Sequence, residues 1–191
     1  MLFRQNSWLS CGAETQLSCF PSTSPASPAS RVNEVLPAIT DSDTLAVRQL
    51  FEQYAASLAI DLGFQHFERE LASLPGDYAP PRGALFLARA DGSPVGCIGL
   101  RPFSDSVGEI KRLYVLPAFR GSGLARSLVS AAIAAARRIG YRALVLDTLA
   151  SMQPAIALYE SFGFERTHAY YTNPLPDVLY FRASLESNRN A

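Results

Sequence analysis

The sequence predicts a single mixed α/β domain, in which one β-sheet carries helices packed against it. Two observations lead to this class. The chain has 191 residues, of which 48% are hydrophobic, and this is enough for one sizeable core. From residue 35 onward, short apolar runs of strand type are interleaved with segments whose apolar residues recur at helical spacing.

The N-terminal segment has a different composition. Residues 18–30 are almost entirely Ser, Pro, Ala and Thr, so they can neither continue a helix nor bury much apolar surface. We therefore expect residues 1–34 to be a disordered tail and residues 35–191 to be the folded domain. A targeting peptide is the alternative, but Arg4 is the only basic residue before Arg31, whereas transit peptides are usually rich in Arg.

The elements of the domain follow from local patterns. Strands are predicted where short apolar or alternating runs lie between turn residues. They cover 35–39, 84–90, 95–103, 108–117, 143–148, 164–171 and 178–185. Helices are predicted where apolar residues recur every three or four positions, and they cover 44–59, 64–74, 124–139 and 154–162. The resulting order is β-α-α-β-β-β-α-β-α-β-β.

Capping and turn residues set the boundaries of these elements. Asp41 and Asp43 are expected to cap the first helix, and Gly63 to end it. The pair Asp91-Gly92 predicts a tight hairpin between the second and third strands. Gly140 is expected to stop the long third helix.

The composition argues against several classes of partner. The formal net charge is +0 and the pI about 6.7, so no basic surplus points to nucleic acid or to an anionic membrane. No apolar run reaches the ~18 residues of a membrane span. Cys11, Cys19 and Cys97 lack CxxC spacing, and two histidines are too few for a histidine metal site. We expect a cytoplasmic protein without a metal, with organelle targeting as the alternative.

A strand-like stretch, a glycine-rich loop and a helix-like stretch follow one another within residues 108–140. Gly121 and Gly123 can adopt positive φ angles, so successive backbone N–H groups can turn toward one point. The start of a helix adds unbonded N–H groups and a partial positive charge. The loop therefore suits a pyrophosphate, with Arg120 and Arg126 as added charge. A glycine-rich connection without a ligand has the same local pattern.

Two nucleotide-binding motifs do not fit this loop. A P-loop needs Lys directly after its last glycine, where this chain has Leu124. The dinucleotide fingerprint belongs to a βαβ fold, and the hairpin upstream disagrees with that fold. In contrast, Arg120-x-x-Gly123-x-Ala125 matches the Arg/Gln-x-x-Gly-x-Gly/Ala signature of the GNAT superfamily of N-acetyltransferases.

The resemblance to this superfamily covers most of the domain, from about residue 36 to 185. LYVLPAFRGSGLARSLV (113–129) is similar to its acetyl-CoA segment, and ALYESFGF (157–164) to its second motif, a helix that runs into a glycine turn and a strand. The resemblance implies a mostly antiparallel sheet with a central splay. It also implies transfer of an acetyl group from acetyl-CoA to a primary amine, by direct attack through a tetrahedral intermediate.

The resemblance further implies where acetyl-CoA binds. The backbone of Leu113, Tyr114 and Val115 is expected to bond the pantetheine arm, with an N–H near Val115 stabilising the oxyanion. The residues expected around the pyrophosphate are Arg120, Gly121, Ser122, Gly123, Leu124, Ala125 and Arg126. Many relatives have Asn before the second motif, where this chain has Met152 and Gln153. The cofactor contact at that position stays open.

Amine acetylation needs a base for the ammonium and an acid for the departing thiolate. Tyr159 matches the position of the family's general acid, and a merely packing Tyr is the alternative. Glu109 is the candidate base, because it lies on the splayed strand and alternation places it on one face with Lys111 and Leu113. A charge-paired, solvated strand face is the alternative reading, and His168 is a second candidate base.

The amine acceptor is left open. Its site is expected between the two N-terminal helices, the loop after Phe103 and the last two strands. The candidate lining residues are Asp61, Phe64, Phe67, Glu68, Tyr170, Tyr171 and Asn173. We expect a small-molecule amine, with a protein or peptide amine, or a non-catalytic acyl-CoA sensor, as alternatives. A homodimer is left open as well.

Overall fold

The computed structural model of the protein describes residues 33–58, 66–175 and 177–186. Residues 1–32 of the predicted tail lie outside these residues, and Asn33 and Glu34 are the first residues of strand β1. The expected helix stop at Gly63 and the acceptor candidates Asp61 and Phe64 also lie outside the described residues.

The described residues form one seven-stranded sheet in the order β1-β2-β3-β4-β5-β7-β6. The strands are β1 (Asn33–Pro37), β2 (Ala84–Ala90), β3 (Ser93–Pro102), β4 (Val107–Val115), β5 (Ala143–Leu149), β6 (Glu165–Thr167) and β7 (Val178–Ser184). Neighbouring strands are antiparallel except β4 and β5, which are parallel. The predicted order of strands and helices and the mostly antiparallel sheet are confirmed.

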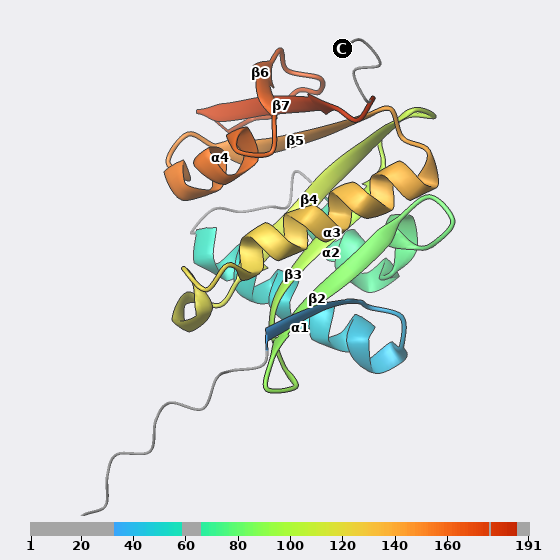
Figure 1. Cartoon of the computed structure of the whole chain (residues 1–191), viewed down its shortest axis with the longest axis vertical. Coiled ribbons are helices and arrows are strands. Elements are labelled where there is room, and N and C mark those ends of the chain that lie inside the picture. The colour runs from blue at the N-terminus through green and yellow to red at the C-terminus, as the bar shows by residue number, and fades with distance from the viewer. Residues whose placement is uncertain (1–32, 59–65, 176, 187–191) are drawn as a thin grey trace, which may run out of the picture. The chain divides into compact units, whose positions relative to one another are not determined.

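Helices cover both faces of this sheet (Figure 1). The described helices are α1 (Asp41–Leu58), α2 (Phe67–Ser73), α3 (Leu124–Ile139) and α4 (Gln153–Glu160), with 3-10 turns η2 (Gly76–Tyr78) and η3 (Pro117–Phe119). α3 and α4 pack on one face over a large apolar cluster, and α1, α2 and η2 enclose a second cluster on the other. None of these described helices is long and apolar enough to cross a bilayer.

The start of α1 corrects a capping prediction. Asp41 and Asp43 were both expected as caps, but Thr40 takes the capping role, because its Oγ1 accepts a hydrogen bond from the Asp43 N–H at 3.1 Å. Asp43 in turn accepts from the Thr40 N–H at 3.0 Å. This reciprocal pair satisfies two backbone donors at once, which a single aspartate cap cannot do.

Two predicted glycine turns have the expected backbone. Asp91 and Gly92 have φ angles of 50° and 79°, which are the values of the hairpin turn that matches strand twist. Gly140 ends α3 with a φ of 98°, and its N–H bonds back to the last turn of the helix.

The sheet divides between its two parallel strands. β4 pairs with β5 only through Val107–Glu109, although both strands continue beyond that point. Beyond it, β4 has a β-bulge in which Arg112 and Leu113 together lie opposite Ile98 of β3. Arg112, the first residue of the bulge, has a φ of 59°. The splay is therefore present where the resemblance implied it.

The bulge also corrects the expected face of one residue. Regular alternation would place Leu113 on the same face as Glu109 and Lys111. The extra residue reverses the alternation, so that Leu113 and Val115 pack on the α3 side and Tyr114 on the α1 side.

Candidate active site

The loop between η3 and α3 presents a run of free backbone N–H groups. None of the six N–H groups from Gly121 to Arg126 donates a hydrogen bond to a described residue. Gly121 and Gly123 have φ angles of 77° and 86°, and a Cβ added at either would meet no described atom within 4 Å. The backbone conformation, rather than packing, therefore requires these glycines. Together the loop and the helix start form an anion cradle.

A cavity of about 540 Å³ opens in front of this cradle, between the end of β4, the end of α1 and the start of α4. Nine of the residues predicted to bind the cofactor line it, namely Leu113, Tyr114, Val115, Arg120, Gly121, Gly123, Leu124, Ala125 and Arg126. Ser122 is not among the lining residues, because its hydroxyl turns to the Phe119 carbonyl at 2.6 Å. Only the backbone N–H of Ser122 can contribute to the anion cradle.

Two arginines stand at the rim of this cavity, and each donates a hydrogen bond to a neighbouring residue. Arg120 donates from Nε to the Val115 carbonyl at 3.2 Å. Arg126 donates to Ser161 Oγ at 3.0 Å, and its guanidinium lies 5.2 Å from the Phe162 ring centre. Because a guanidinium carries five N–H donors, both retain donors for an anion in the cradle.

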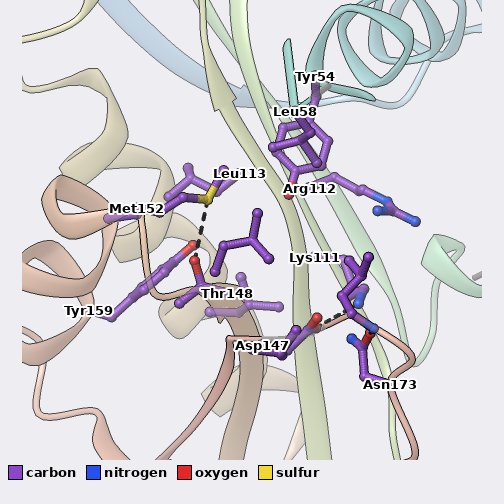
Figure 2. Close-up of a pocket in the computed structure, with 15 residues that line it drawn as sticks. Tyr54, Leu58, Lys111, Arg112, Leu113, Asp147, Thr148, Met152, Tyr159 and Asn173 are labelled. Carbon is purple, nitrogen blue, oxygen red and sulfur yellow. Dashed lines mark hydrogen bonds and ion pairs between the residues drawn. The ribbon is translucent and has the colours of Figure 1, made fainter. Parts of the chain in front are cut away.

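A second, smaller cavity of about 60 Å³ occupies the gap between β4 and β5 (Figure 2). Ile110, Thr148 and Tyr159 line it from the α3 face of the sheet. Lys111 and Asp147 line it from the opposite face. Four residues line both this cavity and the one at the cradle, namely Tyr54, Leu113, Met152 and Ala155. The two cavities therefore share a wall, and the smaller one reaches through the sheet.

Tyr159 lies in this gap, on α4. Its side chain is buried, and its ring packs edge-on against Phe164 at 5.8 Å. Burial raises the pKa of Tyr159 well above its usual value, so the hydroxyl stays protonated at neutral pH. It makes no hydrogen bond to any side chain in the described part of the chain. Nearby, Thr148 donates to the Met152 sulfur at 3.4 Å (Figure 2).

The opposite side of the gap is charged. The Lys111 ammonium donates to Asp147 Oδ1 at 2.7 Å and lies 3.9 Å from Glu109 Oε1. Tyr171 donates to the other oxygen of Asp147 at 2.9 Å. Burial raises the pKa of Asp147, but the charge and hydrogen bond of Lys111 outweigh it and the net pKa is lowered. Asp147 is therefore a carboxylate at neutral pH.

Glu109 is part of the same charged face but does not line the gap cavity. Its carboxylate is 3% exposed and accepts from Arg101 Nε at 2.8 Å and from the Tyr170 hydroxyl at 3.2 Å. It lines a separate cavity of about 400 Å³, together with Arg101, Phe103, Lys111 and Tyr171. This cavity lies on the α2 side of the sheet, next to the loop after Phe103, where the acceptor site was expected.

The bulge residue Arg112 ties β4 to α2. It makes a two-pronged ion pair with Glu70, at 3.1 and 2.7 Å, and its guanidinium lies 5.0 Å from the Phe67 ring centre. Tyr78 donates to the same Glu70 carboxylate at 2.7 Å. These contacts hold the bulge in place. Phe67, a predicted acceptor residue, is thereby buried under Arg112 and lines none of these three cavities.

The remaining candidates divide into two groups. Tyr171 donates to Asp147 beside the gap and lines the cavity of about 400 Å³. Asn173 lines the gap cavity and donates to the Tyr171 hydroxyl at 2.9 Å. Tyr170 bonds Glu109. In contrast, Glu68 and His168 are exposed and line none of these cavities. Gln153 donates to the Ala150 carbonyl at 2.7 Å, so Met152 alone faces the cofactor side.

Sequence reasoning missed the role of Asp147. The signal was available, since Asp147 is a carboxylate in the mainly apolar strand ALVLDT, and a buried charge needs a partner. What the sequence does not show is that Lys111, on another strand, is that partner. Among the described residues, no group of three His, Cys, Asp or Glu side chains is arranged to hold a metal ion.

A sheet that splits between two parallel strands, with an anion cradle beside the split, defines the class of acyl-CoA-dependent N-acyltransferases. The chain belongs to the GNAT acetyltransferase family, whose profile matches residues 45–164.

Relatives and solved structures agree with this assignment. The chain is 41% identical over 140 residues to an N-acetyltransferase of Schizosaccharomyces pombe, covering 72% of this chain and 86% of the relative. It is 35% identical over 136 residues to N-acetyltransferase YjgM of Escherichia coli, covering 69% and 81%. Its fold resembles that of an acetyltransferase from Salmonella typhimurium solved with acetyl-CoA, with a TM-score of 0.61, 20% identity and coverage of 82% and 96%.

Proposed function

We propose that this protein transfers an acetyl group from acetyl-CoA to the primary amine of a small molecule, by direct attack. The observation that carries the proposal is the run of six free N–H groups from Gly121 to Arg126, which opens on a cavity that shares its wall with the splayed gap. A pyrophosphate at the cradle would place the pantetheine arm along Leu113 and the thioester near Tyr159.

Electrostatics and free backbone groups favour the binding of acetyl-CoA at the cradle and in the splay. The cradle offers the partial positive charge of the α3 start, and Arg120 and Arg126 add formal charge at the rim. In the splay, no described strand pairs with the β5 side of β4 beyond Glu109, so an extended arm can bond there as an added strand would. A backbone N–H near Val115 is proposed to stabilise the oxyanion.

The two proton transfers are assigned to opposite faces of the sheet. Tyr159, on the α3 face, is proposed to protonate the departing CoA thiolate. Glu109, on the α2 face, is proposed to accept the proton of the acceptor ammonium in the cavity of about 400 Å³. Because Arg101 and Tyr170 already bond Glu109, the approaching ammonium has to share this carboxylate or reach it through water.

The lining of the acceptor cavity favours a small molecule over a protein. Its wall combines the aromatic side chains of Phe103 and Tyr171 with ion-paired groups, of which Glu109 and Lys111 are deeply buried. A primary ammonium can bond a carboxylate there, while an aromatic wall covers the rest of a compact acceptor.

The cofactor part is tested by calorimetry with acetyl-CoA. Wild-type protein is expected to bind, and Gly123→Glu to bind at least tenfold more weakly, because a carboxylate then occupies the anion cradle. Gly140→Glu is the matched control, since Gly140 has a similar positive φ and open surroundings at the opposite end of α3. Equal affinity in Gly123→Glu and Gly140→Glu would refute the cradle.

The catalytic part is tested by a screen of amines that monitors CoA release. With an active acceptor in hand, Tyr159→Phe is expected to lower kcat by about 100-fold, a typical loss for a general acid, while acetyl-CoA affinity is unchanged. Unchanged turnover would remove Tyr159 from the mechanism. Binding of acetyl-CoA without turnover of any amine would favour an acyl-CoA sensor instead.

A further inference from the structure

Lys111 is the only lysine of the chain. The sequence contains 17 Lys and Arg residues, and every one of the others is Arg. This one lysine is not on the surface, where Lys is usually found, but in the gap between β4 and β5, with its side chain 7% exposed.

An ion pair alone does not explain why this position carries Lys. In the same site, Arg101 and Arg112 pair with Glu109 and Glu70, so the fold holds buried carboxylates with arginine elsewhere. Arginine is also the better partner for a carboxylate, because its planar fork bonds both oxygens. What lysine adds is a primary amine that can give up a proton and then act as a nucleophile.

The face on which Lys111 lies is the acceptor face. Lys111 is the cross-strand neighbour of Gly99, and the open side of Gly99 is covered by the Tyr78 ring of the α2 side. Tyr159 approaches the same gap from the α3 side. The amine of Lys111 and the hydroxyl of Tyr159 therefore enter one cavity from opposite faces (Figure 2).

A base is already in contact with this amine. Asp147 Oδ1 lies 2.7 Å from Lys111 Nζ, and the Tyr171 hydroxyl fixes the other carboxylate oxygen at 2.9 Å. The gap thus holds a nucleophile, a base and an acid around a cavity that shares its wall with the proposed coenzyme site. Lys111 lines both this gap cavity and the cavity of about 400 Å³ proposed for the acceptor.

We propose that Lys111 is a self-acetylation site, at which the enzyme acetylates its own ε-amine when acetyl-CoA is bound and no acceptor is present. The inference rests on the proposed function, because acetyl-CoA has to bind in the cradle. Asp147 takes one proton from the Lys111 ammonium, and the freed amine attacks the thioester carbonyl carbon. The C–N bond forms, the C–S bond breaks, and CoA leaves as the thiolate.

Every proton in this reaction has a donor and an acceptor. Tyr159 donates its proton to the thiolate, and the proton still in excess on the new amide nitrogen restores the Tyr159 hydroxyl. The products are N-acetyl-lysine, CoA thiol and the one proton that Asp147 releases to solvent.

Acetylation of Lys111 would change the site in two ways. It removes the positive charge that pairs with Asp147 and approaches Glu109, so two buried carboxylates lose a common partner. It also places an amide in a gap cavity of about 60 Å³, which leaves little room for a second acyl group. The modified enzyme is therefore expected to turn over acceptors more slowly, so self-acetylation of Lys111 would inhibit the enzyme.

The test is intact-mass spectrometry of the full-length protein incubated with acetyl-CoA and no acceptor, followed by peptide mapping. Wild type is expected to gain the mass of one acetyl group on Lys111. Lys111→Arg removes the only lysine and should gain no acetyl group there, and Asp147→Asn should react at least tenfold more slowly. Gly140→Glu should react like wild type, whereas Gly123→Glu, with its cradle blocked, should not.

Three outcomes overturn the inference by itself. One is acetylation confined to the α-amine of Met1. Another is equal acetylation of wild type and Gly123→Glu, which would show a reaction that needs no bound coenzyme. The third is an unmodified Lys111 in protein that binds acetyl-CoA in the calorimeter, which leaves the proposed function standing. Absence of binding heat would overturn the proposed function together with the inference.

Discussion

Replacing Glu70 by Gln tests whether the bulge on β4 is held from α2. Glu70 accepts both prongs of Arg112 and the hydroxyl of Tyr78, and the Glu70 and Arg112 side chains are 9% and 3% exposed. Glutamine has the same shape but no charge, and it offers one carbonyl oxygen where glutamate offers two acceptors. The Arg112 guanidinium would then be buried without a counter-charge.

The expected loss follows from these contacts. Removing one partner of a buried pair costs about 3–5 kcal/mol, because the other charge stays buried and uncompensated. Since the amide oxygen still accepts one hydrogen bond, we expect the low end, about 3 kcal/mol. For a chain of this size, each kcal/mol lowers the melting temperature by about 2–4 °C, so the melting temperature should fall by about 6–12 °C.

Urea unfolding followed by circular dichroism measures this free energy of unfolding directly. Glu68→Gln is the matched control, because Glu68 lies on the same helix but is exposed, and surface changes of this kind stay within about 0.5 kcal/mol. The m-value should not change if the native fold is kept. If Glu70→Gln loses no more stability than Glu68→Gln, the Arg112–Glu70 pair does not hold the bulge.

Three further predictions concern stability. Gly99→Ala should lower the free energy of unfolding by about 1–3 kcal/mol in urea, since the new Cβ would lie 2.5 Å from the Tyr78 ring; an unchanged midpoint would contradict this contact. Thr40→Ala should cost about 1 kcal/mol in thermal unfolding, because the reciprocal cap with Asp43 is lost, and no loss would show that the cap is dispensable. The folded-state pKa of Glu70 is lowered because Arg112 outweighs burial, so its stabilisation is present above the unfolded pKa of about 4.3 and is lost as pH falls through the folded pKa. Urea midpoints of wild type between pH 7 and pH 3 should therefore fall more than those of Glu70→Gln, and parallel curves would refute this linkage.

Much of the fold could be predicted from the sequence, because it depends on local patterns. Apolar spacing located the strands and helices in the right order, and Asp91-Gly92 and Gly140 adopt the turn and cap conformations that their residue types favour. The cap of α1 was predicted less exactly. Thr40 and the aspartates are all good capping residues, and only the backbone geometry decides which of them caps the helix.

The anion cradle could also be predicted from the sequence. The cradle is a contiguous segment, so the glycines of 121–123 and the helix after them stand together in sequence as they do in space. The residues of this segment line the larger cavity as expected, with Ser122 as the exception. A site built from one segment can be predicted because no long-range contact is needed to assemble it.

The charged side of the gap was decided by tertiary structure. Whether Glu109, Lys111 and Leu113 share a face depends on a bulge at Arg112, and that bulge is anchored by Glu70, 42 residues earlier in the chain. The ion pair of Lys111 with Asp147 joins β4 and β5 beyond Glu109, where the two strands are no longer paired by their backbones. By itself, the sequence determined the family of folds and the place of the anion cradle, because these depend on local backbone preferences. The surroundings of Lys111 needed the structure, because they are made by charges that meet across the split sheet.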